Sequence, residues 1–317
     1  MPFILSAAAA GDSTGFLQVD VVSSQNNFPI QDAVVTISPE AAPDSPIEQL
    51  TTDSSGQTEN LALAAPPLAY SLEPGDVRPY SEYRVHVEAP GFKPVDISGS
   101  EILADATSIQ NVRMEPVGDT APIENDIVIP DHTLYGEYPP KIAENEVKPT
   151  ADTGEIVLSR VVVPEIVVVH DGVPTNASAP NYYVPYRDYI KNVASSEIYA
   201  TWPQASIVAN VLAIMSFTLN RVYTEWYRGQ GYDFTITSST AFDHKWIYGR
   251  NIYESISLVV DEILDNYLSR PGVRQPILTQ YCDGRRVQCP GWMARSRRLY
   301  IVSFLFFHKT FINTTQF

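Results

Sequence analysis

Residues 183–228 decide the fold of the second half of this chain; their sequence is YVPYRDYIKNVASSEIYATWPQASIVANVLAIMSFTLNRVYTEWYR. From Pro203 onward the apolar side chains recur at steps of three and four residues, which predicts one long helix with a buried face. The side chains of that face are Ile207, Val208, Val211, Leu212, Met215, Leu219, Val222, Tyr223 and Trp226. Thr201 can cap this helix, and Pro203 suits its first turn. A single carboxyl group, Glu197, therefore lies between an aromatic-rich strand and a rigid, buried helix.

Glu197 stands in an apolar part of the sequence, close to Val193, Ile198, Tyr199 and Trp202. Apolar surroundings raise the pKa of a carboxyl group towards neutrality, so this side chain is a candidate acid and base for chemistry on a sugar. A plainer interpretation is a glutamate at a helix start that interacts with the positive end of the helix dipole. A two-carboxylate hydrolase would need a second acid about 5 to 9 Å away. The sequence offers only Asp188, Asp243 and Asp283 for that role.

Four short segments of this stretch resemble the core of the SpoIID/LytB family, the stage II sporulation protein D-like proteins. They are YIKNV (189–193), SSEI (195–198), WP (202–203) and ANVLA (209–213). In that family a YLKGVV-x-SEM segment precedes a WP-x-EALKAQAVAART helix. The resemblance continues with gaps from about residue 182 to residue 293. It implies an α+β domain over residues 181–293 that cleaves peptidoglycan glycan strands as a lytic transglycosylase does.

The resemblance also implies roles for individual residues. Glu197 matches the family's catalytic glutamic acid, which protonates the glycosidic oxygen and then takes the proton of the sugar's own 6-hydroxyl. We expect the glycan to be bound by Ser196, Trp202, Trp246, Tyr248 and Tyr281. The aromatic members of this set would stack on sugar rings, although aromatic side chains at helical spacing are more often part of a core.

The chain departs from the family pattern at three places. The long helix carries Met215 and Ser216 where the family has an arginine and a threonine, so the role of that arginine is missing. Residues 244–248, HKWIY, replace a cysteine-bearing HCQVY-like segment, and the closing motif of the family stops after residues 291–293, GWM. These departures favour a second hypothesis, a non-catalytic wall-binding or structural component of a secreted or phage-tail-like assembly.

The two cysteines, Cys282 and Cys289, are separated by six residues. The alternatives for this pair are a disulfide, half of a zinc site or two reduced thiols. Zinc needs about four ligands at once, and only Asp243 and His244 offer themselves as the others. We therefore rank a disulfide or reduced thiols above a metal site, and we expect neither a metal nor another cofactor.

Residues 1–117 carry the pattern of a separate all-β sandwich. Apolar side chains alternate with polar ones in residues 17–21 and 83–87, and turn signals such as TDSSGQ (52–57) and APGF (89–92) separate the runs. The pattern resembles the carboxypeptidase regulatory-like and Cna-B-type domains, which implies a spacer or a docking module for a protein assembly partner. Some relatives start an internal isopeptide bond in their first strand. Because the first lysine here is Lys93, that cross-link is not expected.

Two further segments complete the chain: residues 118–180 connect the two expected domains, and residues 294–317 follow the second one. Residues 118–180 form an acidic, proline-rich linker, and proline at this density makes a stiff, extended connection. We expect short strands within it at residues 155–158 and 166–169. Residues 294–317 become abruptly basic and then rich in phenylalanine, which we interpret as an atypical, poorly packed tail. The sequence therefore predicts a multidomain chain, an N-terminal β-sandwich followed by a C-terminal α+β domain.

Charge is distributed unevenly along the 317 residues, whose net charge is −16. Residues 1–180 contain 27 acidic and 7 basic side chains, and residues 181–317 contain 10 and 14. An acidic chain repels nucleic acid and anionic membrane surfaces, so neither is expected as a partner. We expect no membrane span, because no stretch has the roughly 18 apolar residues that a span requires. Residues 1–10 lack the features of a secretory signal. The resemblance implies action at the bacterial cell wall, and the sequence leaves the localisation and the export route unknown.

Overall fold

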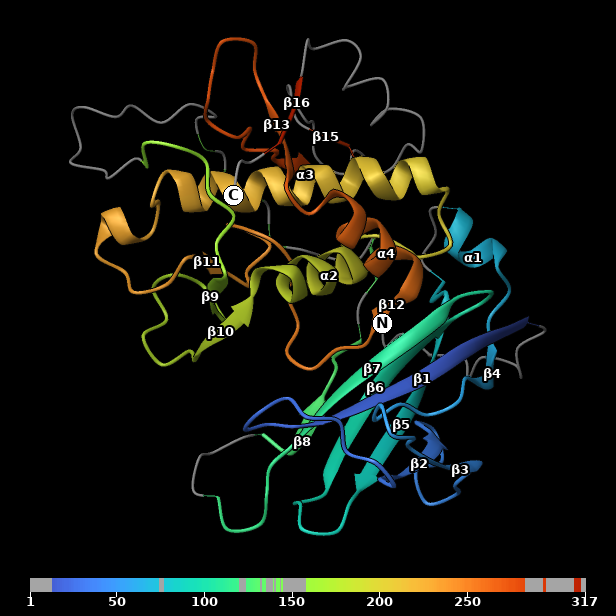
Figure 1. The fold of residues 1–317 in the computed structure, drawn as a ribbon. Coiled ribbons are helices and arrows are strands. Elements are labelled where there is room, and N and C mark those ends of the chain that lie inside the picture. The colour runs from blue at the N-terminus through green and yellow to red at the C-terminus, as the bar shows by residue number, and fades with distance from the viewer. Residues whose placement is uncertain are drawn as a thin grey trace. The chain divides into compact units, whose positions relative to one another are not determined.

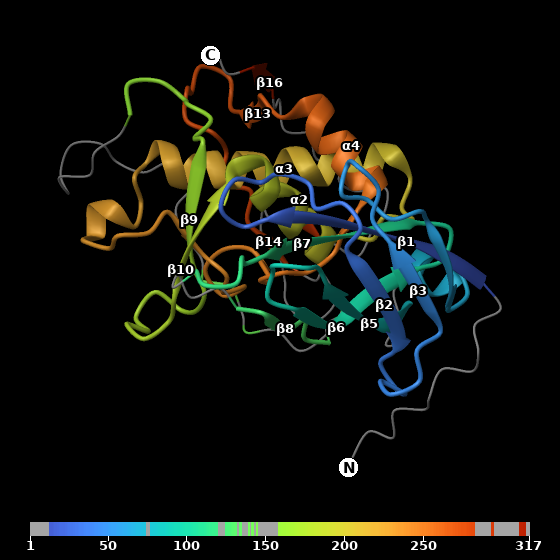
Figure 2. The same cartoon turned by 60° about the horizontal axis from the view of Figure 1, so that its bottom comes forward.

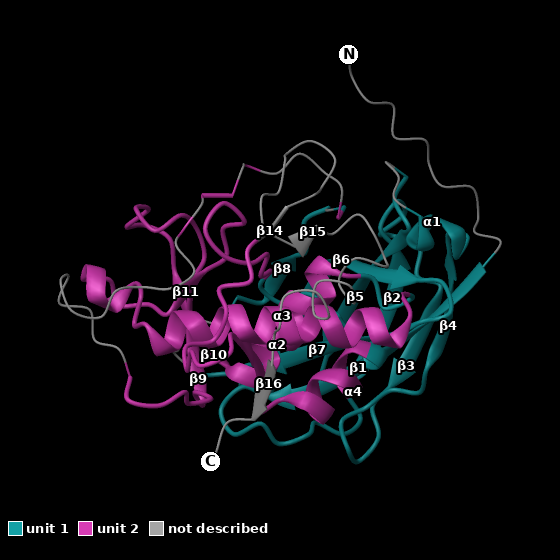
Figure 3. Cartoon of the chain, turned by 90° about the horizontal axis from the view of Figure 1, so that it is seen from above, with its two compact units in different colours: residues 1–133, 199–201, 248–255 teal, residues 134–198, 202–247, 256–317 magenta. Residues whose placement is uncertain are grey.

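The computed structural model of this chain describes residues 13–73, 77–119, 124–131, 133–134, 139, 141–142, 144, 158–282, 293–294 and 311–314. The chain is rich in β-structure, with several sheets and a few helices, and it divides into two compact units. Unit 1 comprises residues 1–133, 199–201 and 248–255, and unit 2 comprises residues 134–198, 202–247 and 256–317 (Figure 3). The domain boundaries expected from the sequence remain a prediction.

Unit 1 is a two-sheet β-sandwich (Figure 1). One sheet has the strand order β4 (Leu61–Ala65), β1 (Ser13–Ser23), β7 (Thr107–Met114) and β12 (Ile252–Tyr253). The other has the order β3 (Glu48–Thr51), β2 (Val34–Pro39), β5 (Tyr80–Glu88), β6 (Val95–Leu103) and β8 (Asp126–Val128). A short helix, α1 (Ala69–Leu72), follows β4. The sandwich expected from the alternating sequence pattern is confirmed.

The core of unit 1 follows directly from that alternation. Leu17, Val19 and Val21 of β1 are each at most 1% exposed, because successive side chains of a strand point to opposite faces. Strands β2, β5 and β6 contribute further buried side chains, among them Val35, Ile37, Val85, Val87, Val95 and Ile97. The two sheets seen in Figures 1 and 2 therefore enclose an aliphatic core typical of a sandwich.

Residues 248–255 come late in the chain but belong to unit 1. Arg250 Nη2 donates to Glu101 Oε2 at 2.7 Å, and neither side chain is more than 4% exposed. Asn251 makes two further bonds with the backbone of Glu101: it accepts from Glu101 N at 3.0 Å, and its Nδ2 donates to Glu101 O at 2.9 Å. Because β12 also pairs antiparallel with β7, this segment completes the sandwich by backbone, amide and charge interactions at once.

Unit 2 contains three helices and three small sheets within its described residues. The helices are α2 (Tyr186–Glu197), α3 (Gln204–Tyr223) and α4 (Glu254–Ile263), of which residues 254–255 fall in unit 1. The first sheet has β9 (Ile166–His170) between β10 (Asn181–Pro185), which is antiparallel to it, and β11 (Ile236–Thr237), which is parallel. The other sheets are the pairs β13 (Asn266–Ser269) with β16 (Phe311–Thr314) and β14 (Tyr281–Cys282) with β15 (Met293–Ala294). A short 3-10 helix, Arg228–Gln230, follows α3.

Helix α3 is buried more completely than the sequence predicts. The apolar steps indicate one buried face, but every residue from 209 to 221 is buried. Two polar side chains of the helix form hydrogen bonds with carbonyl groups one turn earlier. Ser216 Oγ donates to Leu212 O at 2.6 Å, and Thr218 Oγ1 donates to Ile214 O at 2.9 Å. Such bonds between neighbouring turns remove the cost of burying a hydroxyl group.

The start of α3 differs from the expectation in one detail. The helix begins at Gln204 after Pro203, and Ser206 N donates to Pro203 O at 2.8 Å. The expected cap from Thr201 is wrong, because Thr201 Oγ1 donates to Ser71 Oγ at 2.8 Å instead. Pro203 therefore fixes the helix start by its own backbone geometry, without a capping side chain.

One helix in the described part of the chain, residues 204–230, is long and apolar enough to cross a membrane by length and composition. Its most apolar window has a mean hydropathy of 1.4, and 89% of that window is buried inside the structure. This degree of burial is that of a core helix, so it gives no clear membrane span.

Residues 155–158 and 294–317 lie largely outside the described residues. The strand expected at 166–169 forms as β9, whereas the strand expected at 155–158 is described only at residue 158. Of the tail, only residues 294 and 311–314 are described, and the latter form β16, which pairs antiparallel with β13.

We predict that Arg250→Met destabilises unit 1 by about 3–5 kcal/mol, because it leaves Glu101 as a buried carboxylate without its cation. Hydrogen exchange of peptides that cover β6 and β7 measures this loss directly. Arg113→Met on β7 is the matched control, since Arg113 is exposed and its removal should change stability by no more than about 0.5 kcal/mol. Equal protection in the two variants would contradict the importance of the buried pair.

Candidate functional site

Glu197 is the last residue of α2, and its side chain is buried. The chain leaves the helix at Ile198, whose N–H donates to Ala194 O at 3.0 Å. The interpretation of Glu197 as a helix-start residue is therefore wrong, because it lies at the C-terminal end, where the helix dipole disfavours a negative charge. Glu197 Oε1 instead accepts a hydrogen bond from the backbone N of Lys245 at 2.8 Å. Something other than helix electrostatics accounts for a carboxyl group at this position.

Residues 243–247, which we call the anchored segment, lie along one face of α2. Asn192 Nδ2 donates to Ile247 O at 2.7 Å, and Ile247 N donates to Asn192 Oδ1 at 3.1 Å. One turn earlier, the Tyr189 hydroxyl lies 3.4 Å from His244 Nδ1. Tyr189, Asn192 and Glu197 thus bond the segment from one end to the other, which fixes where the Lys245 N–H points.

Aromatic rings enclose the anchored segment. The Trp246 ring lies 5.3 Å from that of Tyr182 on β10, and Trp246 is only 5% exposed. The His244 ring lies 4.5 Å from that of Phe217 on α3, and His244 is 1% exposed. Ring pairs at these distances pack favourably beyond the area that they bury. The anchored segment is therefore part of a packed core rather than a free loop.

The first residue of the anchored segment, Asp243, is fully buried and receives four hydrogen bonds. Its Oδ1 accepts from Arg221 Nε at 2.7 Å. Its Oδ2 accepts from the Tyr227 hydroxyl at 2.7 Å and from Thr237 N and Oγ1 at 2.9 and 2.7 Å. Arg221 also forms a two-point pair with Glu144, at 2.8 and 2.7 Å. Asp243 thus joins α3, β11 and the anchored segment through one carboxylate.

The pKa values in this network show which charges it holds. Burial alone would raise the pKa of Asp243, but the charge of Arg221 and the hydrogen bonds from Tyr227 and Thr237 outweigh burial and hold it below its ordinary 3.8. Burial would lower the pKa of Arg221, but the negative charges of Asp243 and Glu144 raise it. The pKa of the Tyr227 hydroxyl is raised by burial first and by the charge of Asp243 second. Asp243 is therefore ionised and Arg221 is protonated at neutral pH.

The structure brings together only part of the residue set expected from the sequence. Glu197 and Trp246 both belong to unit 2, and Glu197 accepts a hydrogen bond from the backbone N–H of Lys245, the residue before Trp246. Ser196 is buried beside Glu197, and its hydroxyl donates to Asn192 O at 2.9 Å, so it is committed to the helix. Trp202 is 9% exposed and belongs to unit 2, whereas Tyr248 is partly buried and belongs to unit 1.

The remaining candidate residues include some that lie outside the described side chains. Only the backbone of Tyr281 and Cys282 is described, in β14, and Cys289 and Asp283 lie outside the described residues. Asp188 is exposed in the first turn of α2, at the other end of that helix from Glu197. Asp243 is committed to Arg221, Tyr227 and Thr237. In the described part of the chain, no three His, Cys, Asp or Glu residues are grouped as metal ligands.

Sequence reasoning missed Arg221, although a signal for it exists. Arg221 is the only charged residue of α3 between Gln204 and Tyr223. A lone charge in an apolar helix has to be paired when it is buried, because an isolated buried ion is costly. The sequence therefore contains the need for an acidic partner, but it does not say that Asp243 and Glu144 supply it.

No protein-family model matches the chain, and no curated protein matches it in sequence. Among solved structures it is similar to the Bacillus anthracis TIE protein at 18% identity, covering 33% of this chain and 17% of that chain, with a TM-score of 0.23. A minor pilin of Streptococcus agalactiae matches at 14% identity over 35% and 48% of the two chains, with a TM-score of 0.24. A Klebsiella pneumoniae 5-hydroxyisourate hydrolase matches at 15% identity over 32% and 92%, with a TM-score of 0.21. This chain thus spans less than half of the first two proteins, and likenesses at these values identify no family.

We predict that Asp243→Asn destabilises unit 2 by about 3 kcal/mol, because Arg221 then keeps only one of its two buried carboxylates. Since the pKa of Asp243 is lowered in the folded state, its contribution is fully present above the ordinary value of 3.8 and is lost as pH falls through the lowered value. The variant should therefore also lose less stability between pH 5 and pH 3 than the parent does.

Urea denaturation followed by tryptophan fluorescence at both pH values measures these effects. Asp261→Asn on α4 is the matched control, because Asp261 is exposed and pairs with Lys191 at 2.9 Å on the surface. Surface pairs contribute about 0–1 kcal/mol, so this variant should stay close to the parent. A similar loss in both variants would contradict the role assigned to Asp243.

Proposed function

We propose that this chain is a peptidoglycan-directed protein whose second unit cleaves glycan strands, with Glu197 as the single general acid and base. The observation that carries the proposal is the position of Glu197. It is buried at the end of a helix that disfavours its charge, and it is held by a backbone N–H. Residues kept in a locally unfavourable setting are expected at functional sites. The resemblance of SSEI and WP to the SpoIID/LytB core supports the same residue.

The chemistry needs only one carboxyl group. As an acid, Glu197 would protonate the glycosidic oxygen while that bond breaks; as a carboxylate, it would then take the proton of the 6-hydroxyl as the anhydro ring closes. The Lys245 N–H, 2.8 Å from Oε1, would hold the carboxyl group in one orientation through both steps. The indole ring of Trp246, which follows Lys245, would provide an apolar wall for a sugar.

A second function is favoured by the burial of Glu197, which is only 2% exposed. A general acid has to come within about 2.6–3.2 Å of the oxygen that it protonates. If Glu197 stays buried, the unit would bind cell-wall material without cleaving it, as a structural component of a secreted assembly. In both cases the protein acts at the cell wall, and the β-sandwich of unit 1 would serve as the spacer or the docking module for an assembly partner.

We predict that Glu197→Gln lowers glycan cleavage about 10²- to 10⁴-fold, the usual effect of removing a positioned general acid. Gln retains an oxygen that accepts from the Lys245 N–H, so folding and wall binding should stay unchanged. The test is digestion of purified peptidoglycan, followed by mass spectrometry for anhydro-muropeptides. Glu262→Gln on α4 is the matched control, because it makes the same change at an exposed position of unit 2.

The outcomes separate the two functions. Anhydro products from the parent and from Glu262→Gln, but not from Glu197→Gln, support the enzyme. Equal products from all three proteins would rule out Glu197 as the acid. Sedimentation of all three proteins with intact peptidoglycan, without any cleavage, would support the non-catalytic function instead.

A further inference from the structure

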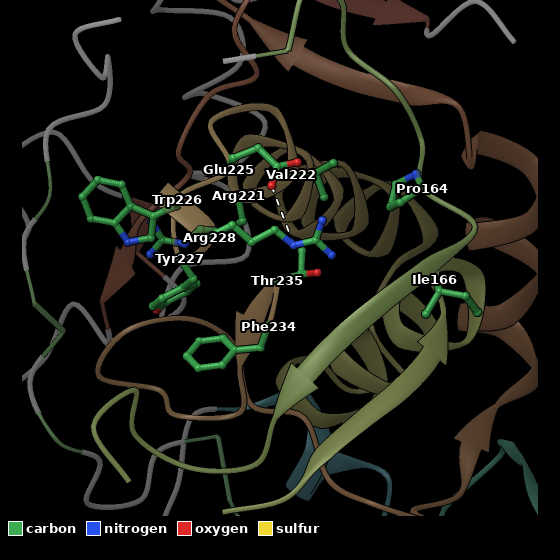
Figure 4. A pocket seen from close by; sticks show the side chains of 10 residues that line it. All are labelled: Pro164, Ile166, Arg221, Val222, Glu225, Trp226, Tyr227, Arg228, Phe234 and Thr235. Atoms are coloured by element: carbon green, nitrogen blue, oxygen red, sulfur yellow. Dashed lines mark ion pairs between the residues drawn. The ribbon is translucent and has the colours of Figure 1, made fainter. Parts of the chain in front are cut away.

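A separate cavity of about 220 Å³ opens in unit 2 where α3 ends (Figure 4). Its wall includes Ile166, Val222, Glu225, Trp226, Arg228 and Phe234. Its volume is below the roughly 300–1,000 Å³ of pockets that enclose a whole drug-sized ligand. A cavity of this size suits one end of a larger molecule.

Two opposite charges at this cavity face each other without forming a close bond. Arg228 Nε lies 3.7 Å from Glu225 Oε2, which is longer than a hydrogen bond. The Arg228 side chain is 55% exposed and that of Glu225 is 21% exposed. Within the described residues, no hydrogen bond engages the terminal nitrogens of Arg228. Figure 4 shows the guanidinium among the lining residues, joined to Glu225 by the dashed line.

The other cation of the cavity, Arg221, is already engaged. Its guanidinium donates to Asp243, to both oxygens of Glu144 and to Phe242 O. It is also fully buried, and it lies 5.5 Å over the Trp226 ring. Arg221 therefore forms part of the wall, whereas Arg228 and Glu225 supply the charges that a ligand can reach.

The backbone at Glu225 is held in a conformation that this residue type rarely adopts. Its φ is +46°, in the left-handed region that costs about 1 kcal/mol or more for a residue with a side chain. The conformation is fixed on both sides: Glu225 N donates to Val222 O at 3.2 Å, and Gly229 N donates to Glu225 O at 2.7 Å. This turn ends α3 and places Glu225 and Arg228 at the same cavity. Backbone strain of this kind clusters at ligand sites.

We propose that this cavity binds a zwitterionic amino-acid end, in which an ammonium and a carboxylate share one carbon. The guanidinium fork of Arg228 receives the carboxylate, since this geometry matches two parallel hydrogen bonds. Glu225 receives the ammonium, and Ile166, Val222 and Phe234 contact the aliphatic stem. One charge of each sign in the pocket selects against ligands that carry only one of the two groups. If the function proposed above holds, the natural source is the free amino-acid end of a peptide stem in the wall.

Calorimetric titration of the full chain with 2,6-diaminopimelic acid tests the proposal. Pimelic acid, which lacks the ammonium groups, and 1,5-diaminopentane, which lacks the carboxylates, are the matched ligands and should bind at least about 10-fold more weakly. Arg228→Gln should weaken binding of the amino acid about 10-fold or more, because it removes the charged fork. Arg84→Gln in unit 1 is the control variant and should leave binding unchanged.

Glu225→Asn removes the negative charge but keeps the backbone conformation at this position, because asparagine tolerates the left-handed region. This variant should fold as stably as the parent and lose the preference for diaminopimelic acid over pimelic acid. The proposal would be overturned if the parent bound pimelic acid as tightly as diaminopimelic acid, or bound N-acetylglucosamine more tightly than diaminopimelic acid. It would also be overturned if the parent did not bind diaminopimelic acid. Glu197→Gln should bind like the parent, so a failure of glycan cleavage and a failure of this site are told apart.

Discussion

The buried ion pair between Arg221 and Asp243 is the interaction on which the arrangement of unit 2 depends. Helix α3 carries no other charge, so its single guanidinium would be costly to bury without an acid beside it. Asp243 removes that cost, and its other oxygen binds Tyr227 and Thr237. Once Asp243 is fixed, the two residues that follow it have little freedom, and the N–H of Lys245 meets Glu197 at 2.8 Å. The orientation of Glu197 is thus linked to a charge on another helix.

Unit 1 depends on a pair of the same kind. Glu101 and Arg250 are 149 positions apart in sequence and 2.7 Å apart in space, and both are buried. A buried pair of charges adds little net stability compared with an apolar pair, but losing one partner is costly. We infer that these pairs specify which distant segments come together. In unit 1 the pair selects residues 248–255, and in unit 2 it selects the anchored segment.

The parts of the fold that the sequence predicts are those that depend on near neighbours. Alternation in β1 and the three- and four-residue steps of α3 follow from local geometry, and both elements form where they are expected. The position of Glu197 could not be predicted in the same way, because the end of α2 depends on where Ile198 leaves the helix. The partners of Arg221 were not predictable either, since Glu144 lies 77 positions away. Long-range pairing of polar groups leaves no periodic signal in the sequence.

The burial of Glu197 and the exposure of Arg228 have opposite consequences for function. A carboxyl group that is 2% exposed can reach a sugar oxygen only if neighbouring groups move. A guanidinium that is 55% exposed needs no such motion to bind a ligand. Arg221 lines the cavity and also pairs with Asp243, the first residue of the anchored segment. A ligand bound in the cavity would therefore contact a residue that helps to hold the anchored segment. A coupling of this kind requires two arrangements of unit 2, one with Glu197 buried and one with Glu197 accessible, to which the ligand binds with different affinity. If Arg221 keeps its two carboxylates in both arrangements, the proposed ligand binding and the proposed cleavage would be independent of each other.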